Sequence, residues 1–318
     1  MGEFDLIRRC CTRARPSRAD VLLGIGDDCA LLAPPAGRQL AVSLDLLVSG
    51  VHFLADVDPW RLGWKALAVN LSDLAAAGAE PAWVTLGLTL PAADESWLAA
   101  FMDGFFALAD RYAVQLVGGD TTRGPLAIAV QVHGFVEPGQ ALIRGGARPG
   151  DLLCVSGVPG EAAVGLALRL GRLELPAALA APCIDRLECP EPRVALGRAL
   201  RGLASAALDV SDGLAQDLGH LLDASGVGAT LDVDALPRSA SLQALGAAAL
   251  ELALAGGDDY ELLFTIPPDR RDELTACAAA AGVALTVIGR IEAAADLRLR
   301  HADGRPCSLA RSGYDHFA

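Results

Sequence analysis

Apolar runs of strand length alternate with helical patterns along most of the 318 residues. This alternation is typical of mixed α/β domains, because each strand and helix must bury an apolar face against a neighbour. In the first half we expect strands at 40–48, 82–90, 114–118 and 125–136 and helices at 59–77 and 94–112. In the second half we expect strands at 151–156, 206–210, 228–233, 261–266 and 284–290 and helices at 160–171, 190–204, 213–224 and 268–281.

Two turn signals lie between the two series, at Glu137-Pro-Gly-Gln140 and Arg148-Pro-Gly-Asp151. The length also suits two domains of ordinary size. We therefore predict a first domain at 1–138 and a second at 150–318, both of mixed α/β (α+β) fold. With 53% hydrophobic but only 5% aromatic residues, the cores must consist mainly of Ala, Leu and Val.

The charge and the apolar pattern exclude several classes of protein. The formal charge of −13 would repel a nucleic acid in the absence of bound cations. No run of 18 or more apolar residues is present, and four of the first ten residues are charged, so we expect neither a membrane span nor a signal peptide. The eight cysteines lack the spacing of zinc sites. These features indicate a cytoplasmic protein with reduced thiols.

Acidic residues gather beside glycine or serine in short segments between the predicted strands and helices. The six segments are Gly24–Asp28, Ser43–Asp45, Asn70–Asp73, Gly118–Thr122, Asp209–Gly213 and Gly256–Glu261. Aspartates brought together repel one another unless a divalent cation shares their charge, and Mg²⁺ prefers such oxygen ligands and bridges them to phosphates. Any one Gly-Asp or Ser-Asp pair is more often a turn or a helix cap. The six together favour a site for metal ions and phosphates.

The usual nucleotide and hydrolase signatures are absent from the sequence. It has no G-x-x-x-x-G-K-[ST], no G-x-G-x-x-G after a strand, no protein-kinase motif set, no H-E-x-x-H and no G-x-S-x-G. Phosphates would instead be held by metal ions, by backbone amides around 118–121 and by arginines such as Arg123 and Arg144. His52, just after a predicted strand, fits a loop residue or a ligand equally well.

Lys65 is the only lysine in the chain and lies two helical turns before Asp73. We expect it to interact with the acidic cluster, and biased codon usage is the alternative explanation for its being the only one.

In their order along the chain, the acidic segments resemble those of the thiamine-monophosphate kinase family. The resemblance extends over 24–32, 65–75, 118–124 and 256–262 and includes the terminal segments 2–7 and 313–317. That family shares a superfamily with aminoimidazole ribonucleotide synthetase, selenophosphate synthetase and a hydrogenase-maturation protein. The terminal segments indicate the thiamine-monophosphate branch.

The resemblance implies that ATP phosphorylates thiamine monophosphate to thiamine diphosphate, the last step in making that compound. It implies a homodimer of two-domain α/β subunits, in which strands of the first domains join into a shared sheet or barrel and the active site lies between the domains. It also implies several Mg²⁺ ions, and it leaves a role for K⁺ open.

The resemblance further implies roles for individual residues. Metal ions would be held by Asp28, Ser43, Asp45, Asp73, Asp120, Asp209 and Asp212, ATP by Gly119, Asp120, Arg144 and Ser211, and thiamine monophosphate by His52, Asp258 and Tyr314. Asp120 and Asp212 would act in catalysis through the metal ions. Leu44 stands where the family commonly has threonine and can offer a metal only its backbone carbonyl. Asp258 stands where the family commonly has glutamate, one methylene longer.

The expected mechanism needs no strong general base. A phosphate monoester has a second pKa of about 6 and is therefore largely ionised near neutrality. Positioning, metal ions and arginine then carry the reaction, and we expect direct transfer without a phospho-enzyme. Two alternatives stay open: another ATP-dependent synthetase of the superfamily, and a dimeric nucleotide-binding protein without turnover.

Overall fold

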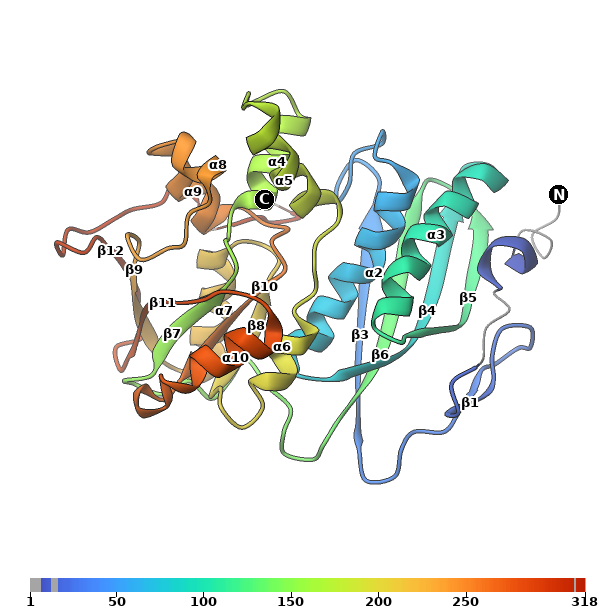
Figure 1. The fold of residues 1–318 in the computed structure, drawn as a ribbon, viewed down its shortest axis with the longest axis horizontal. Coiled ribbons are helices and arrows are strands. Elements are labelled where there is room, and N and C mark those ends of the chain that lie inside the picture. Colours follow the sequence, from blue (N-terminus) through green and yellow to red (C-terminus); the bar gives the residue numbers. More distant parts are fainter. Residues whose placement is uncertain (1–6, 13–16, 312, 318) are drawn as a thin grey trace. The chain divides into compact units, whose positions relative to one another are not determined.

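The computed structural model describes residues 7–12, 17–311 and 313–317. They form two compact units (Figure 1). Unit 1 consists of the described residues up to Leu74 together with 79–139, and unit 2 consists of 75–78 and the described residues from 140 onward. Of the terminal segment 2–7 that carries the family resemblance, residues 2–6 lie outside the described residues.

Unit 1 is built on a four-stranded sheet. Its strands, in spatial order, are β3 (Gln39–Val48), β6 (Ala127–Val136), β4 (Glu80–Leu90) and β5 (Gln115–Arg123). β4 and β5 are parallel, and the other two pairs are antiparallel. The helices α2 (Pro59–Ala76) and α3 (Glu95–Arg111) lie on one face of this sheet (Figure 1). The remaining elements are the π-helix η1 (Ile7–Cys11) and the two-stranded ribbon of β1 (Val21–Leu23) and β2 (Leu31–Leu32).

The helix-facing side of this sheet is apolar, as alternation along the strands requires. β6 buries Ile128, Val130 and Val132, and α3 buries Phe101 and Phe105. α3 begins where the Asp94 side chain accepts a hydrogen bond from the backbone N–H of Trp97, 3.0 Å away. That bond satisfies one of the amides that a helix start leaves without a partner.

Unit 2 contains a six-stranded mixed sheet and most of the helices. The strands, in spatial order, are β12 (Leu297–Arg300), β9 (Gly228–Asp232), β11 (Leu285–Glu292), β7 (Leu152–Ser156), β10 (Glu261–Ile266) and β8 (Ala206–Val210). The helices are α4 (Glu161–Arg169), α5 (Ala177–Glu188), α6 (Val194–Ala199), α7 (Leu214–Ser225), α8 (Ala240–Ala244), α9 (Ala248–Ala255), the 3₁₀ turn η2 (Pro268–Arg270) and α10 (Glu273–Ala281).

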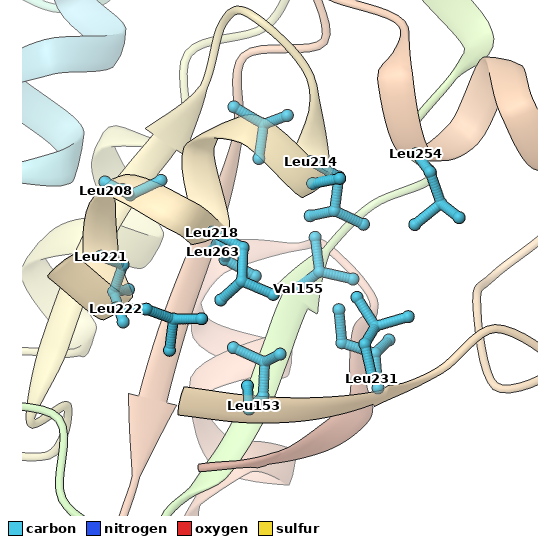
Figure 2. Packing of buried hydrophobic residues seen from close by; sticks show 14 of the residues in the cluster. Leu153, Val155, Leu208, Leu214, Leu218, Leu221, Leu222, Leu231, Leu254 and Leu263 are labelled. Atoms are coloured by element: carbon cyan, nitrogen blue, oxygen red, sulfur yellow. The ribbon is translucent and has the colours of Figure 1, made fainter. Parts of the chain in front are cut away.

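The core of unit 2 lies between α7 and the sheet. Leu214, Leu218, Leu221 and Leu222 recur at helical spacing and form the apolar face of α7. Figure 2 shows these side chains beside Leu153, Leu208 and Leu263, which come from three neighbouring strands. This packing fixes the start of α7 above the carboxyl end of β8, where Asp209 lies.

The predicted mixed α/β fold is confirmed, but some elements differ. The predicted helix at 190–204 is wrong over most of its length, because Pro190 and Pro192 lack the amide hydrogen that a helix interior needs and the turn at 200–203, where Gly202 has a φ of 68°, ends the helix. The helix α5 was not predicted, since Pro182 lies inside it. The short elements β1, β2, β12, α8 and α9 were also missed. In the part of the chain that the structure describes, no helix combines the length and the apolar character needed to cross a bilayer.

Candidate active site

Asp120 and Gly119 lie within β5, although the sequence pattern ended this strand at 118. The strand continues because residues 119–122 pair in register with residues 86–89 of the parallel strand β4. A Cβ atom on Gly119 would lie only 2.0 Å from the carbonyl oxygen of Leu86, so this close approach requires glycine. The neighbouring Asp120 is exposed.

A pocket opens beside Asp120 within unit 1. Its cavity volume is only about 40 Å³, and its lining consists of Cys11, Ile25, Leu86, Leu88, Leu116, Gly118, Gly119, Asp120 and Thr121. The walls are mainly apolar, and Asp120 is the only acidic residue among the described residues of the lining. A small number of polar groups in an apolar pocket is typical of small-molecule sites.

Ser43 and Asp73 meet where β3 passes α2. Ser43 pairs with the buried Val132, so its side chain lies on the helix-covered face, and its Oγ donates to Asp73 Oδ2 at 2.5 Å. Two residues further along, the backbone N–H of Asp45 donates to Asn70 Oδ1 at 3.0 Å. The first segment lies inside the strand predicted at 40–48, and the second lies near the end of the helix predicted at 59–77.

Leu44 lies on the opposite face of β3 from Ser43 and Asp45, since successive side chains alternate across a strand. Its side chain is 56% exposed. The side chain of residue 44 therefore points away from Asp73, and the expectation that Leu44 offers only its backbone carbonyl stays a prediction.

The other predicted residues of unit 1 lie in simpler settings. Asp28 is exposed between β1 and β2, where its backbone N–H donates to Asp27 Oδ1 at 2.8 Å. His52 follows β3, and its Nδ1 accepts a hydrogen bond from the backbone N–H of Val48 at 3.0 Å. Lys65 is buried within α2, only 3% exposed, and its link to the acidic cluster stays a prediction.

Magnesium fits the donor atoms of unit 1, which are carboxylate and hydroxyl oxygens. The hydrogen bond between Ser43 and Asp73 shows that two such donors already lie together. Among the residues that the structure describes, however, no three Asp, Glu, His or Cys side chains are grouped so that they could share one ion. Because Mg²⁺ usually combines one or two carboxylates with substrate phosphates, a pair of protein donors is a sufficient starting point.

In unit 2, the predicted residues Asp209, Ser211 and Asp212 lie at the junction of β8 and α7. Asp209 is buried near the end of β8. Asp217, in the first turn of α7, accepts three hydrogen bonds from the backbone of this junction. The pKa of the Asp217 carboxyl is raised to about 6, chiefly by burial and in part by the charge of Asp212, while the three backbone hydrogen bonds act in the opposite direction. Sequence reasoning missed Asp217, although its place four residues after Gly213 was a usable signal.

The segment 256–261 holds acidic residues of different kinds. Asp258 and Tyr260 have φ values of 68° and 50°, and Tyr260 Oη donates to Asp258 Oδ1 at 2.9 Å. Asp259 is buried and accepts from the backbone N–H groups of Gly160 and Ala162, at the start of α4. Of this segment, only Asp258 was predicted to bind substrate, and it lies at the edge of a tightly bonded turn.

Tyr314 joins this group, whereas Arg144 lies elsewhere in unit 2. The backbone N–H of Tyr314 donates to the carbonyl oxygen of Asp212 at 3.0 Å, and its side chain is 45% exposed. The carbonyl oxygen of Arg144 accepts from Ser225 Oγ, at the end of α7 that is away from Ser211. The structure thus brings Ser211, Asp212 and Tyr314 together, and the joint contact of Arg144 and Ser211 with ATP stays a prediction.

Comparisons with known proteins match both units. Residues 26–136 match the family described as AIR synthase related protein, N-terminal domain, and residues 148–302 match the corresponding C-terminal domain. The thiamine-monophosphate kinase of Salmonella typhimurium is 52% identical over 320 aligned positions, which cover 100% of this chain and 98% of that protein. This chain belongs to the thiamine-monophosphate kinase family.

Solved structures agree with this family relationship. The crystal structure of a thiamine-monophosphate kinase from Stenotrophomonas maltophilia is 50% identical, with a TM-score of 0.85 over 91% of this chain and 93% of that one. A structure described as AaThiL complexed with AMPPCP and TMP is 33% identical, with a TM-score of 0.79 over 99% of this chain and 97% of that one. The fold of a thiamine-monophosphate kinase therefore extends over both units.

Proposed function

We propose that this protein transfers the γ-phosphate of ATP to thiamine monophosphate and releases ADP and thiamine diphosphate. The observation that carries this proposal is the 52% identity to a thiamine-monophosphate kinase from one end of the chain to the other. The complex of a structural relative with AMPPCP and TMP supports the choice of both substrates.

The residues of unit 1 suit the binding of phosphates and ions. Asp120 lies on the wall of an apolar pocket, and beside it Gly119 lets β5 pack closely against the backbone of β4. Ser43 on β3 and Asp73 on α2 present adjoining oxygen atoms, and Asp45, two residues after Ser43, is hydrogen-bonded to α2 through its backbone N–H. Magnesium bound by these residues and by Asp28 would supply positive charge to phosphates, and in unit 2 the proposed metal ligands are Asp209 and Asp212.

The residues of unit 2 suit the orientation of the acceptor. Asp258 and Tyr314 both lie on segments that are hydrogen-bonded to the junction of β8 and α7. For unit 1, the proposed contact with thiamine monophosphate is His52. The acceptor phosphate is its own nucleophile, so these residues need only to bind it, orient it and exclude water.

We also propose a cytoplasmic homodimer. β3 lies at an edge of its sheet and exposes a stripe of Leu40, Val42, Leu44 and Leu46. An exposed edge strand with apolar side chains is a surface that proteins usually cover. A cytoplasmic location supplies the ATP that the reaction consumes.

The experiment that tests the function measures ADP and thiamine diphosphate in parallel. Purified protein is incubated with Mg²⁺ and ATP, with thiamine monophosphate, with thiamine, or with no acceptor, and products are identified by mass. Equal amounts of ADP and thiamine diphosphate, formed only with thiamine monophosphate, are expected. Chelation of Mg²⁺ should stop the reaction, and replacing K⁺ by Na⁺ tests the monovalent ion. ADP release that ignores thiamine monophosphate would instead indicate a synthetase of the same superfamily, and no turnover at all a binding protein.

A further inference from the structure

The Asp217 carboxylate binds the backbone of the junction between β8 and α7 through hydrogen bonds. Its Oδ2 accepts hydrogen bonds from the backbone N–H groups of Ser211 at 3.0 Å, Asp212 at 3.1 Å and Gly213 at 3.1 Å. Asp217 is the fourth residue of α7, and because side chains in a helix lean toward its N-terminus, the carboxylate points back at the junction. The residue is only 4% exposed.

The carbonyl groups of the same junction hold two distant segments of unit 2. The carbonyl oxygen of Ser211 accepts from the N–H of Asp258 at 2.8 Å, and that of Asp212 accepts from the N–H of Tyr314 at 3.0 Å. Gln216, also in the first turn of α7, donates from Nε2 to the carbonyl oxygen of Tyr314 at 2.8 Å. The segments that carry Asp258 and Tyr314 are therefore hydrogen-bonded to the same backbone residues whose N–H groups donate to Asp217.

We infer that Asp217 is a positioning residue, whose buried carboxylate sets the backbone on which Ser211, Asp258 and Tyr314 are arranged for binding. The inference rests on the proposed function, because it concerns residues assigned to the ATP and thiamine monophosphate contacts. Three consecutive N–H groups converge on one oxygen only in a particular backbone conformation, the arrangement known as a nest. Without that acceptor, three backbone N–H groups lose their hydrogen-bond partner, and the backbone conformation of residues 211–213 is no longer stabilised by these bonds.

This arrangement also limits how the junction can act on ATP. The start of a helix commonly binds a phosphate through its free backbone amides. Here, the amides of 211–213 already donate to Asp217. Ser211 and Asp212 must therefore contact phosphates or ions through their side chains. Asp217 fixes the backbone positions from which those side chains extend.

The test compares Asp217→Ala and Asp217→Asn with a matched change, Asp151→Ala. Asp151 is also a buried carboxylate of unit 2, and its Oδ2 accepts from the N–H of Arg148 and from Ser205 Oγ. Ser205 and Ser211 lie at opposite ends of the extended strand β8, so the two carboxylates act roughly 20 Å apart. Both alanine variants should lower Tm, and only the change at 217 should disturb the binding segments.

Steady-state kinetics well below the Tm of each variant give the first result. Asp217→Ala should raise KM for thiamine monophosphate and lower kcat, each by about tenfold or more, because small misplacements of binding groups are costly in catalysis. Asp217→Asn keeps an acceptor oxygen and should recover part of both losses. Asp151→Ala should leave both constants within about twofold of the wild type, as expected for a distant site. Unchanged constants in Asp217→Ala, or equal losses in Asp151→Ala, would overturn the inference.

Hydrogen exchange gives a second result that needs no activity. In Asp217→Ala, or in Asp217→Asn if the alanine variant does not fold, amides in 208–214, 256–262 and 313–317 should exchange faster together. In Asp151→Ala they should match the wild type. Unaltered exchange at 256–262 and 313–317 would disprove the coupling even in an active enzyme. If the wild type forms no thiamine diphosphate but the variants show this exchange pattern, the proposed function is refuted and the structural role of Asp217 still stands.

Discussion

Asp258, Asp259 and Glu261 lie within four residues, yet each side chain has a different environment. Asp258 accepts from Tyr260 Oη, and Asp259 accepts from backbone amides at the start of α4. Glu261 is buried and pairs with Arg193, whose Nε lies 2.7 Å from Oε2. One acidic segment thus supplies a candidate substrate contact, a helix cap and an internal ion pair.

The buried Asp259 leads to a prediction about pH. Burial raises the pKa of its carboxyl well above the ordinary value, although the N–H groups of Gly160 and Ala162 act in the opposite direction. From the unfolded pKa of about 3.9 up to the raised native pKa, the native state holds more protons, so this residue makes stability fall as pH rises. Urea unfolding of the wild type and Asp259→Asn at several pH values should show the steeper fall in the wild type.

Asp94 provides a control of opposite sign for that measurement. Hydrogen bonds from Ser96 and from the backbone of Trp97 lower the pKa of the Asp94 carboxyl. Its stabilising effect is therefore present above the unfolded pKa and is lost as pH falls through the lowered native pKa. Asp94→Asn should remove a contribution that grows with pH. Equal pH slopes in the wild type and Asp259→Asn would contradict the assignment for Asp259.

For Asp120, we predict a large loss of turnover without a loss of fold. The residue is exposed on β5, so Asp120→Asn removes little buried structure. Removing one charge that acts on the transferring phosphate should lower kcat by about a hundredfold or more, the usual effect of single electrostatic groups in catalysis. Asp303→Asn changes another exposed aspartate and serves as the control. Near-normal turnover of Asp120→Asn, with Tm unchanged, would remove Asp120 from the metal site.

At the scale of elements, α2 and α3 are in close contact at two glycines, one on each helix. A Cβ on Gly63 would lie 1.8 Å from the carbonyl oxygen of Phe101, and one on Gly104 would lie 1.8 Å from that of Trp60. The backbones therefore touch, which keeps α2 close to the sheet and Asp73 within reach of Ser43. The sequence predicted both helices, but nothing in their apolar spacing indicated this contact.

We predict that Gly63→Ala destabilises the protein by about 1–3 kcal/mol or more, because the added methyl group would press into backbone that cannot yield. Gly219→Ala is the matched control, since Gly219 lies in α7 and a Cβ there meets nothing within 4 Å. That change should be neutral or stabilising by up to about 1 kcal/mol, given the helix propensity of alanine. Chemical denaturation measures both, and an equal response of the two variants would argue against the close helix crossing.

At the scale of the whole molecule, elements defined by local pattern could be predicted from sequence. The strand expected at 206–210 and that at 261–266 have the observed ends. Their antiparallel pairing could not be predicted, because it joins Val210 to Glu261 across fifty-one residues through a ladder that no local signal encodes. The candidate site follows the same division: Asp120 and Asp212 stand in recognisable segments, whereas the role of Asp217 depends on where its carboxylate points after folding.

The exposed stripe of β3 leads to the prediction about assembly. Leu44 and Leu46 are 56% and 54% exposed on the face of β3 opposite Ser43, and in a homodimer that joins through β3 both would be covered. The double change Leu44→Glu and Leu46→Glu would place two charges in that apolar contact, whose burial is costly. Sedimentation should therefore show a dimer for the wild type and a monomer for the double variant, while the intrinsic fold of unit 1 is kept.

Leu166→Glu is the control for this last prediction, because Leu166 is also an exposed leucine but lies on α4 in unit 2. That variant should stay dimeric if β3 forms the interface. A monomeric wild type would refute the homodimer itself, and a double variant that stays dimeric would move the interface away from β3. If the double variant is monomeric and also loses the formation of thiamine diphosphate while its circular dichroism is unchanged, pairing through β3 is needed for activity as well as for assembly.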